Sequence, residues 1–405
     1  MRKILAVLAL ILSAGLAFGV GLAEFDYSSG EVGKKALIRL PKDRKEVKAL
    51  LYTHQNMTEE VLFRSKLFTD RMDSLGVAMA FIQSGSQNWD PASDCQARFE
   101  SIIEDFATCT GHPEIATAPI IPFGHSAQAT FPWNFAAWNP DRTLCVISYH
   151  GDAPRTNLCG YGRENVEWGR TRNIDSIPGL MIEGEYEWWE ARVRPALAFR
   201  MMYPESRISF LCDAGKGHFD LCEDTQLYMA RFIEKALADP RPAGGVFYSR
   251  WLEDGSESLD PHDRFWYQDE EMASWTRRRY EESRGKEMQY VSAKINGKLI
   301  PFNADSHIKM NLDIDGEEFS LEPVFVNESR NALSKKHSNT RPRIVLISGP
   351  AIQTGEYSFR YDPEYFGYDP NRLWSGITLC IEADGDDRYK YAVQELNIHL
   401  KKANN

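Results

Sequence analysis

Short apolar runs alternate with longer amphipathic segments through the first 240 residues of the chain. The apolar runs predict β-strands at 36–40, 48–54, 77–83, 118–123, 144–150, 179–183 and 207–213. Apolar residues at helical spacing predict helices at 58–75, 94–108, 188–203 and 224–237. Uninterrupted apolar strands are typical of a sheet that is covered on both faces. The alternation therefore predicts an α/β domain over 24–240, with a mostly parallel sheet flanked by helices.

The pattern changes after residue 240, where Pro240-Arg241-Pro242-Ala243-Gly244-Gly245 predicts a boundary. A Trp-rich and charged stretch follows, which predicts a partly helical connector over 241–287 with a helix at 269–282. From 288 to 405, short alternating runs are separated by turn residues such as Asn296-Gly297. These runs predict a smaller, β-sandwich-like C-terminal domain.

The chain begins with a basic pair, Arg2 and Lys3, followed by an apolar run to about Gly21 and the small residue Ala23. This order predicts a signal peptide over 1–23 and export to the periplasm or the exterior. A membrane anchor is the alternative, because a run of about 18 residues is near the lower limit for spanning a bilayer. The glycines in the run and the missing basic flank favour cleavage. No later run is apolar enough to span a membrane, so we expect no stable insertion after cleavage.

Composition narrows the classes of partner and cofactor. A net charge of −11, with acidic and basic residues mixed along the chain, offers no continuous basic face for nucleic acid. Seven cysteines in an exported chain permit disulfides, and Cys212 and Cys222, on either side of His218, are the first candidates for a bridge. No paired CxxC or HExxH spacing is present, so we predict no metal and no cofactor.

Two motifs carry candidate chemistry. Gly124-His125-Ser126-Ala127-Gln128 lies between a predicted central strand and an amphipathic stretch at 130–138. A tight strand-to-helix turn exposes the serine hydroxyl at the carboxyl edge of a parallel sheet, where ligands bind. Gly217-His218-Phe219 follows the last predicted strand of the sheet on a glycine turn.

These motifs resemble the nucleophile elbow and the histidine loop of the α/β-hydrolases. The resemblance implies Ser126 as nucleophile and His218 as its base. The run 178–187 resembles the penultimate strand and acid turn of that family, which implies Glu187 as the acid that orients His218. Glu185 and Asp152 remain alternatives for this acid. The chain departs from the family at Gln128, where a glycine is usual.

A tetrahedral oxyanion needs donors aimed at it. The resemblance implies the backbone amide of Ala127 as one donor. The second would come from Gln55 or Asn56, in the loop after the strand at 48–54. The same residues also fit a simple polar turn that opens the next helix.

The mature chain also resembles exported bacterial carbohydrate esterases with a C-terminal β-domain, through motifs such as Phe265-Trp266-Tyr267 and Ser348-Gly349-Pro350-Ala351. The resemblance implies a secreted serine esterase that removes methyl or acetyl groups from plant cell-wall polysaccharide, with pectin as one candidate. A serine peptidase shares the same triad and remains an alternative. A catalytically inactive carbohydrate-binding protein remains another, because Gln128 breaks the elbow pattern.

Substrate contacts are predicted from aromatic and basic residues near the same rim. Trp89, Trp133 and Trp188 could stack on sugar rings, although each also fits a core position. Arg155, in an irregular insertion predicted over 152–176, could pair with the carboxylate of a uronate.

Overall fold

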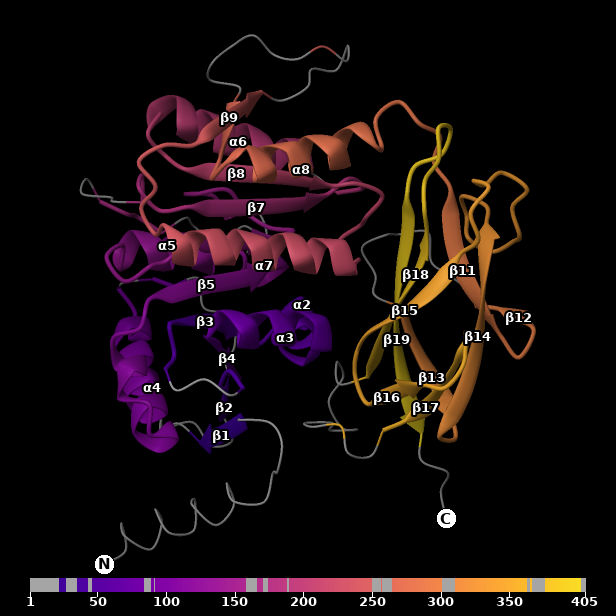
Figure 1. The fold of residues 1–405 in the computed structure, drawn as a ribbon, viewed down its shortest axis with the longest axis horizontal. Helices are drawn as coiled ribbons and strands as arrows, with labels where there is room; N and C mark the ends of the chain where they lie inside the picture. Colours follow the sequence, from indigo (N-terminus) through magenta and orange to yellow (C-terminus); the bar gives the residue numbers. More distant parts are fainter. Residues whose placement is uncertain are drawn as a thin grey trace, which may run out of the picture.

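The structure is a computed structural model that describes residues 22–26, 35–42, 46–83, 89–90, 92–157, 166–169, 174–187, 189–249, 256, 264–300, 310–362, 365 and 376–401. An α/β body and a β-sandwich lie side by side (Figure 1). Within the described ranges, no helix has the length and apolar character needed to cross a membrane. The predicted signal peptide lies outside them except for Leu22 and Ala23, which begin strand β1 (Leu22–Asp26).

The α/β body is built on an eight-stranded sheet with the order β1-β2-β4-β3-β5-β6-β7-β8. The strands after β1 are β2 (Lys35–Arg39), β3 (Ala49–His54), β4 (Val77–Ile82), β5 (Ile120–His125), β6 (Val146–Tyr149), β7 (Gly179–Gly184) and β8 (Ile208–Asp213). Strand β2 runs antiparallel to its neighbours, and β3 to β8 are parallel. This part of the chain is therefore an α/β fold built on a mostly parallel sheet. The predicted fold class is confirmed.

Two apolar clusters fill the space on either side of this sheet, because successive strand residues point to opposite faces. Leu51 joins the cluster that contains Phe68 of helix α3 (Lys66–Leu75). The next residue, Tyr52, joins the cluster that contains Phe99 of helix α4 (Cys95–Thr110). The prediction of strands covered on both faces is confirmed.

The helices of this body are α2 (Met57–Arg64), α3 (Lys66–Leu75), α4 (Cys95–Thr110), α5 (Phe131–Trp138), α6 (Trp189–Met202) and α7 (Glu223–Ala238). Two 3-10 turns are added, η1 (Pro113–Ala116) and η2 (Ser126–Gln128). The single helix predicted at 58–75 is broken at Ser65, whose backbone is extended. The Ser65 side chain accepts a hydrogen bond from the amide of Phe68 and so caps α3, which explains the break.

The Trp-rich segment predicted as a connector forms strands β9 (Val246–Ser249) and β10 (Arg264–Tyr267) and helix α8 (Glu270–Glu281). It packs on the edge strand β8. The Tyr267 hydroxyl donates to the carbonyl of Phe210 at 2.6 Å, and the Ser209 hydroxyl donates to the carbonyl of Trp266 at 2.6 Å. These contacts make the segment part of the α/β body rather than a free linker.

The C-terminal body is a sandwich of a five-stranded sheet, β12-β11-β14-β17-β16, and a four-stranded sheet, β13-β19-β18-β15. Its strands are β11 (Tyr290–Ile295), β12 (Lys298–Leu299), β13 (Met310–Asp315), β14 (Glu318–Val326), β15 (Arg343–Ser348), β16 (Ala351–Gln353), β17 (Ser358–Tyr361), β18 (Ile377–Ala383) and β19 (Ala392–Lys401). Asn296 and Gly297 have φ angles of 50° and 76°, as the predicted hairpin turn requires. The predicted β-sandwich-like part is confirmed.

The sandwich packs directly against the α/β body. Ile347, Cys380 and Val393 belong to the same core cluster as the parallel sheet. The Cys380 thiol also donates to the carbonyl of Leu221 at 2.9 Å. The two bodies therefore share a core next to the loop between β8 and α7.

The described cysteines are free thiols: Cys95, Cys109, Cys145, Cys212, Cys222 and Cys380. The predicted Cys212–Cys222 bridge is therefore wrong. The Cys222 sulfur lies instead against the amino group of Lys216, at 2.7 Å. Cys159 lies outside the described residues.

Candidate active site

Ser126 follows directly on β5 and begins the 3-10 turn η2. Its φ angle of 53° lies in the left-handed region, which is strained for a serine and typical of a nucleophile elbow. Gly124 is needed for this turn, because a Cβ there would lie 2.1 Å from the carbonyl oxygen of Gln128. The close approach involves the backbone of residue 128 and not its side chain. A glutamine at this position is therefore compatible with the turn.

A second close contact packs this turn against the end of the neighbouring strand β6. A Cβ on Gly151, just after β6, would lie 1.8 Å from the Cβ of Ala129. The small pair Gly151 and Ala129 lets the turn after Ser126 lie tightly against the sheet.

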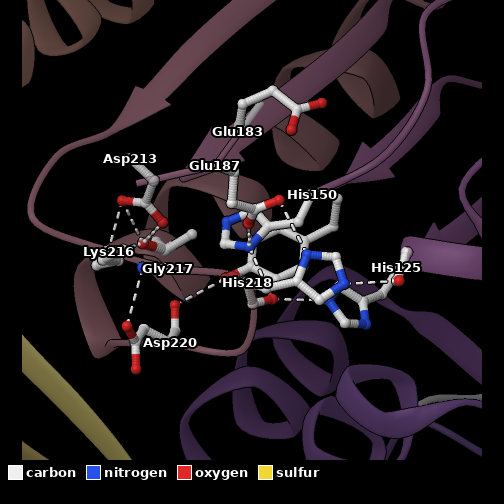
Figure 2. A network of polar contacts seen from close by, with 12 residues as sticks. His125, His150, Glu183, Glu187, Asp213, Lys216, Gly217, His218 and Asp220 are labelled. Atoms are coloured by element: carbon white, nitrogen blue, oxygen red, sulfur yellow. Dashed lines mark hydrogen bonds and ion pairs between the residues drawn. The ribbon is translucent and has the colours of Figure 1, made fainter. Parts of the chain in front are cut away.

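His218 lies on the loop between β8 and α7 and contacts both other members of the predicted triad. Its Nε2 lies 2.6 Å from the Ser126 hydroxyl, and its Nδ1 lies 2.9 Å from Oε2 of Glu187. In this arrangement Ser126 donates to Nε2, and Nδ1–H donates to the carboxylate. Figure 2 shows the His218 ring beside Glu187. The three side chains form one continuous hydrogen-bonded line.

The two alternative acids make other contacts. Glu185 accepts a hydrogen bond from the amide of Gly215 at 2.8 Å and pairs with Lys390 of the sandwich. Asp152 accepts a hydrogen bond from the Thr130 hydroxyl at 2.6 Å. Their contacts support structural roles for both, and Glu187 is the acid that reaches His218.

Glu187 is buried and held by three cationic or polar partners. Oε1 lies 2.9 Å from Nδ1 of His150, and Oε2 lies 3.0 Å from the Arg192 guanidinium. Burial alone would raise the pKa of Glu187, but His150 and His218 outweigh it and hold the pKa well below its ordinary value. The carboxylate therefore stays charged.

A second buried carboxyl shares this arginine. Glu183 of β7 lies 2.9 Å from Arg192, and burial raises the pKa of Glu183 to about 8 against the opposing effect of Arg192. Arg192 therefore lies between two buried carboxyl groups and offsets negative charge on both.

Burial lowers the pKa of His218 below its ordinary value, while the Glu187 carboxylate acts in the opposite direction. The net effect keeps the imidazole neutral at pH 7. A neutral ring with its proton on Nδ1 leaves Nε2 free to accept the proton of Ser126.

Two further histidines hold the backbone of His218. Nε2 of His125 and Nδ1 of His150 lie 2.8 and 2.9 Å from the carbonyl oxygen of His218. Nitrogens of these three rings lie within 4.8 Å of one another, a spacing that could hold a metal ion. A metal ion bound there would have to replace the hydrogen bonds to the His218 carbonyl or to Ser126. These hydrogen bonds already explain how the three rings are oriented.

The contacts of the predicted oxyanion donors argue against Gln55 and are compatible with Ala127 and Asn56. The backbone amide of Gln55 donates to the carbonyl of Ile82 at 2.8 Å, which commits it to the sheet and argues against Gln55 as a donor. Asn56 is the N-cap of α2, and its side chain donates to the carbonyl of His125 at 2.7 Å, next to the nucleophile. Ala127 follows Ser126 in the turn and is half-buried. Ala127 and Asn56 remain the candidate donors.

Two of the predicted sugar-binding residues, Trp89 and Trp133, are buried in the core. Trp89 and Trp133 are each 2% exposed. Trp89 contacts Phe135 in an aromatic cluster, and Trp133 donates to the carbonyl of Asp152. Their assignment as sugar platforms is wrong, because apolar packing has buried both rings.

Trp188 and Arg155 are the other two residues predicted to contact the substrate. Trp188 lies outside the described residues. Arg155 is half-buried, and its guanidinium lies 5.8 Å from the centre of the Trp168 ring.

Sequence reasoning missed several polar residues around the triad: His150 and Arg192, which contact Glu187, and Glu183 and Glu59, which contact Arg192 and the backbone of His125. Glu59 accepts a hydrogen bond from the backbone amide of His125 at 2.6 Å. His150 carries a detectable signal, because it directly follows a predicted central strand and so lies at the edge that collects ligands. Arg192 and Glu183 lie in an ordinary helix and strand, and no motif marks them.

No protein-family model matches this chain, and no curated protein matches it. Among solved structures, the chain is similar to Est1E from Butyrivibrio proteoclasticus, with 15% identity and a TM-score of 0.35 over 54% of this chain and 100% of that one. It is similar to S-formylglutathione hydrolase (FrmB) from Staphylococcus aureus, with 12% identity and a TM-score of 0.38 over 55% of this chain and 99% of that one. A hyperthermophilic esterase from the archaeon Pyrobaculum calidifontis shows 13% identity and a TM-score of 0.39, over 58% and 91% of the two chains.

Proposed function

We propose that this protein is a serine hydrolase of carboxylic esters that works through an acyl-enzyme. The observation that supports this most strongly is the unbroken line of hydrogen bonds from Glu187 through His218 to Ser126, with Ser126 in a strained turn at a strand end. Serine, histidine and a buried carboxylate in this order are what acyl transfer needs.

In the first half of the reaction, the Ser126 hydroxyl attacks the ester carbonyl carbon and its proton passes to Nε2 of His218. Glu187 stabilises the imidazolium that forms. The backbone amides of Ala127 and Asn56 would donate to the oxyanion. The tetrahedral intermediate then collapses, and the alcohol leaves with the proton from Nε2.

In the second half, His218 removes a proton from water, and the resulting attack on the acyl carbon releases the acid and restores the Ser126 hydroxyl. The arrangement supports this step because His218 keeps its tautomer and position throughout, held by Glu187 at 2.9 Å.

For the substrate class, we infer methyl or acetyl esters on plant cell-wall polysaccharide, hydrolysed after export of the protein. This finer proposal depends on the resemblance of the whole chain to exported carbohydrate esterases. Arg155 supports it, because a half-buried guanidinium beside Trp168 could receive the carboxylate of a uronate and its sugar ring.

The activity is tested with an activated fluorophosphonate and with a simple aryl acetate. We expect the wild-type protein to react with both. The Ser126→Ala variant should lose labelling and lose roughly 10^4-fold or more in kcat, as for loss of a triad nucleophile. The matched control is Ser74→Ala, at an exposed serine of α3, which should behave like the wild type. Turnover by Ser126→Ala at the wild-type rate would refute the proposal.

The substrate class is tested by incubating the enzyme with methyl-esterified pectin and with acetylated xylan, and measuring methanol and acetate separately. Peptide amides serve as the comparison. Release of either product faster than peptide cleavage supports a carbohydrate esterase. Hydrolysis of the aryl acetate with no release from either polysaccharide would leave the esterase standing and overturn the substrate class.

A further inference from the structure

Lys216 and Cys222 stand at the two ends of the segment that carries His218. Both are buried, with exposed fractions of 0% and 3%. The Lys216 amino nitrogen lies 2.7 Å from the Cys222 sulfur. The proposed reaction uses neither side chain.

This separation is shorter than that of an ordinary hydrogen bond between nitrogen and oxygen, about 2.9 Å, although sulfur is the larger atom. It is longer than a direct covalent bond involving sulfur, since even two sulfur atoms bond at about 2.04 Å. A distance between these limits suits two atoms joined through one small bridging atom.

The Lys216 amino group has two further partners. The amino group lies 2.6 Å from Oδ1 of Asp213 and also contacts the Thr225 hydroxyl. Asp213 is paired with Arg279 as well. Asp213 would therefore keep Arg279 as its cationic partner if the Lys216 nitrogen took part in a covalent bond.

Cys222 lies at the wall of a cavity. It lines a cavity of about 580 Å³ between α7, α8 and the sandwich, together with residues such as Ala214, Trp275 and Tyr391. A molecule as small as dioxygen inside this cavity would lie next to Cys222.

We infer that Lys216 and Cys222 are a site of oxidative crosslinking, at which one oxygen atom joins the lysine nitrogen to the cysteine sulfur. The oxidant is dioxygen. The amine loses one N–H bond and the thiol its S–H bond, while one N–O and one S–O bond form. Four electrons pass from nitrogen and sulfur to dioxygen, whose second oxygen leaves as water. The balanced change is Lys–NH2 + HS–Cys + O2 → Lys–NH–O–S–Cys + H2O.

The crosslink closes a ring around the catalytic loop. Residues 217–221, including His218, lie between the two joined side chains. A dithiol reductant reverses the step, because two dithiols supply the four electrons and leave the amine, the thiol, water and two disulfides. The bridge would therefore form a reversible covalent tie on the histidine loop.

The test is high-resolution mass spectrometry of the full-length protein, kept under air or under nitrogen with a dithiol. The crosslinked protein gains one oxygen and loses two hydrogens. We expect this change only in the aerobic sample, and peptide mapping should join the segments containing Lys216 and Cys222. The Cys222→Ser variant should lack it, and the matched control Cys212→Ser, at another buried thiol, should keep it.

Three results would overturn the inference. One is recovery of Lys216 and Cys222 as separate, unmodified side chains in the aerobic wild-type protein. Another is oxidation of Cys222 alone to an acid while Lys216 stays free. The third is a joined pair that has lost two hydrogens without gaining oxygen. Since the measurement needs no substrate, each of these results is independent of the proposed esterase activity.

Discussion

Glu59 lies beneath the nucleophile turn as an uncharged carboxyl. Its Oε1 accepts a hydrogen bond from the amide of His125 at 2.6 Å, one residue before Ser126. Burial raises the pKa of Glu59 to about 8, although the His125 amide acts in the opposite direction. The folded protein therefore keeps a proton on Glu59 at neutral pH that the unfolded chain, with the ordinary pKa of 4.5, releases.

This difference makes stability depend on pH. Because the pKa is higher in the folded state, the stabilising effect of the proton is complete below pH 4.5 and is lost as the pH rises to about 8. Glu59→Gln removes this dependence while keeping an oxygen acceptor for His125. We expect the free energy of unfolding of the variant to fall less between pH 5 and pH 8.5, by on the order of a few kcal/mol.

Urea unfolding at both pH values measures the effect, with Glu104→Gln on the exposed face of α4 as the control. An equal fall in the wild type and in Glu59→Gln would contradict the assignment of a neutral Glu59.

At the residue scale, the sequence predicted those side chains that follow a recognisable backbone pattern. Ser126 and His218 each lie in a glycine-containing turn at a strand end, and such a turn can be recognised from the local sequence. His150 and Arg192 were not assigned, because contact with Glu187 depends on how distant elements pack. The sugar-binding roles predicted for Trp89 and Trp133 failed for the same reason, since the sequence does not show which face of an element will be buried.

At the scale of elements, the histidine loop is tied to both bodies. Asp220 accepts hydrogen bonds from the amide of Gly217 at 2.9 Å and from the amide of Glu395, in β19 of the sandwich, at 3.0 Å. Gly215 allows the same loop to approach β19, since a Cβ there would lie 2.2 Å from the carbonyl oxygen of Tyr391. The position of His218 therefore depends on a strand from the other end of the chain.

Asp220→Asn tests this dependence. An amide can accept only one of the two hydrogen bonds and brings a donor against the other, so the loop should shift. We expect kcat to fall roughly 10- to 100-fold, as for an ångström-scale misplacement of a catalytic group, with a much smaller change in KM.

Steady-state kinetics on an aryl acetate give both constants, and the rate of fluorophosphonate labelling should fall in parallel. Glu322→Gln makes the same chemical change at an exposed pair with Lys294 of the sandwich and should leave kcat unchanged. If Asp220→Asn also kept the wild-type kcat, the sandwich would not position His218.

The first and last residues of the strands were predicted more closely than the pairing between strands. Most strands of the parallel sheet lie within two residues of the predicted limits, because buried runs are bounded by polar residues. The break at Ser65 was missed, since the apolar spacing continues through it. The parallel pairing of β13 with β19 could not be predicted, because Met310 and its partner Leu396 are 86 positions apart in the sequence. A local pattern does not encode pairing between segments this far apart.

At the scale of the whole molecule, the sandwich and the α/β body share one apolar core. Val393 and Ile347 of the sandwich belong to the cluster that also contains Tyr228 of α7. Lys390 adds an ion pair to Glu185 beside the acid turn. A shared core couples the unfolding of two bodies, since exposing one also exposes the face of the other.

We therefore expect differential scanning calorimetry of the intact chain to show one cooperative transition. Val393→Ala, which truncates a side chain on the sandwich side of the shared core, should lower that midpoint and the temperature of activity loss together. Ile352→Ala, at an exposed position of β16, is the control and should change neither. Two separate transitions, with activity surviving the first, would show that the bodies are independent.

The contacts of two histidine rings with the His218 carbonyl limit how the His218 side chain can transfer a proton. His125 and His150 hold the backbone oxygen of His218 at 2.8 and 2.9 Å, from two adjacent strand ends. With that peptide anchored, rotation about χ1 and χ2 is the freedom left to the imidazole. The imidazole must then take the proton from Ser126 and give it to the leaving alcohol within a small rotation of the ring. Only an alcohol bound near Ser126 can therefore be protonated as it leaves.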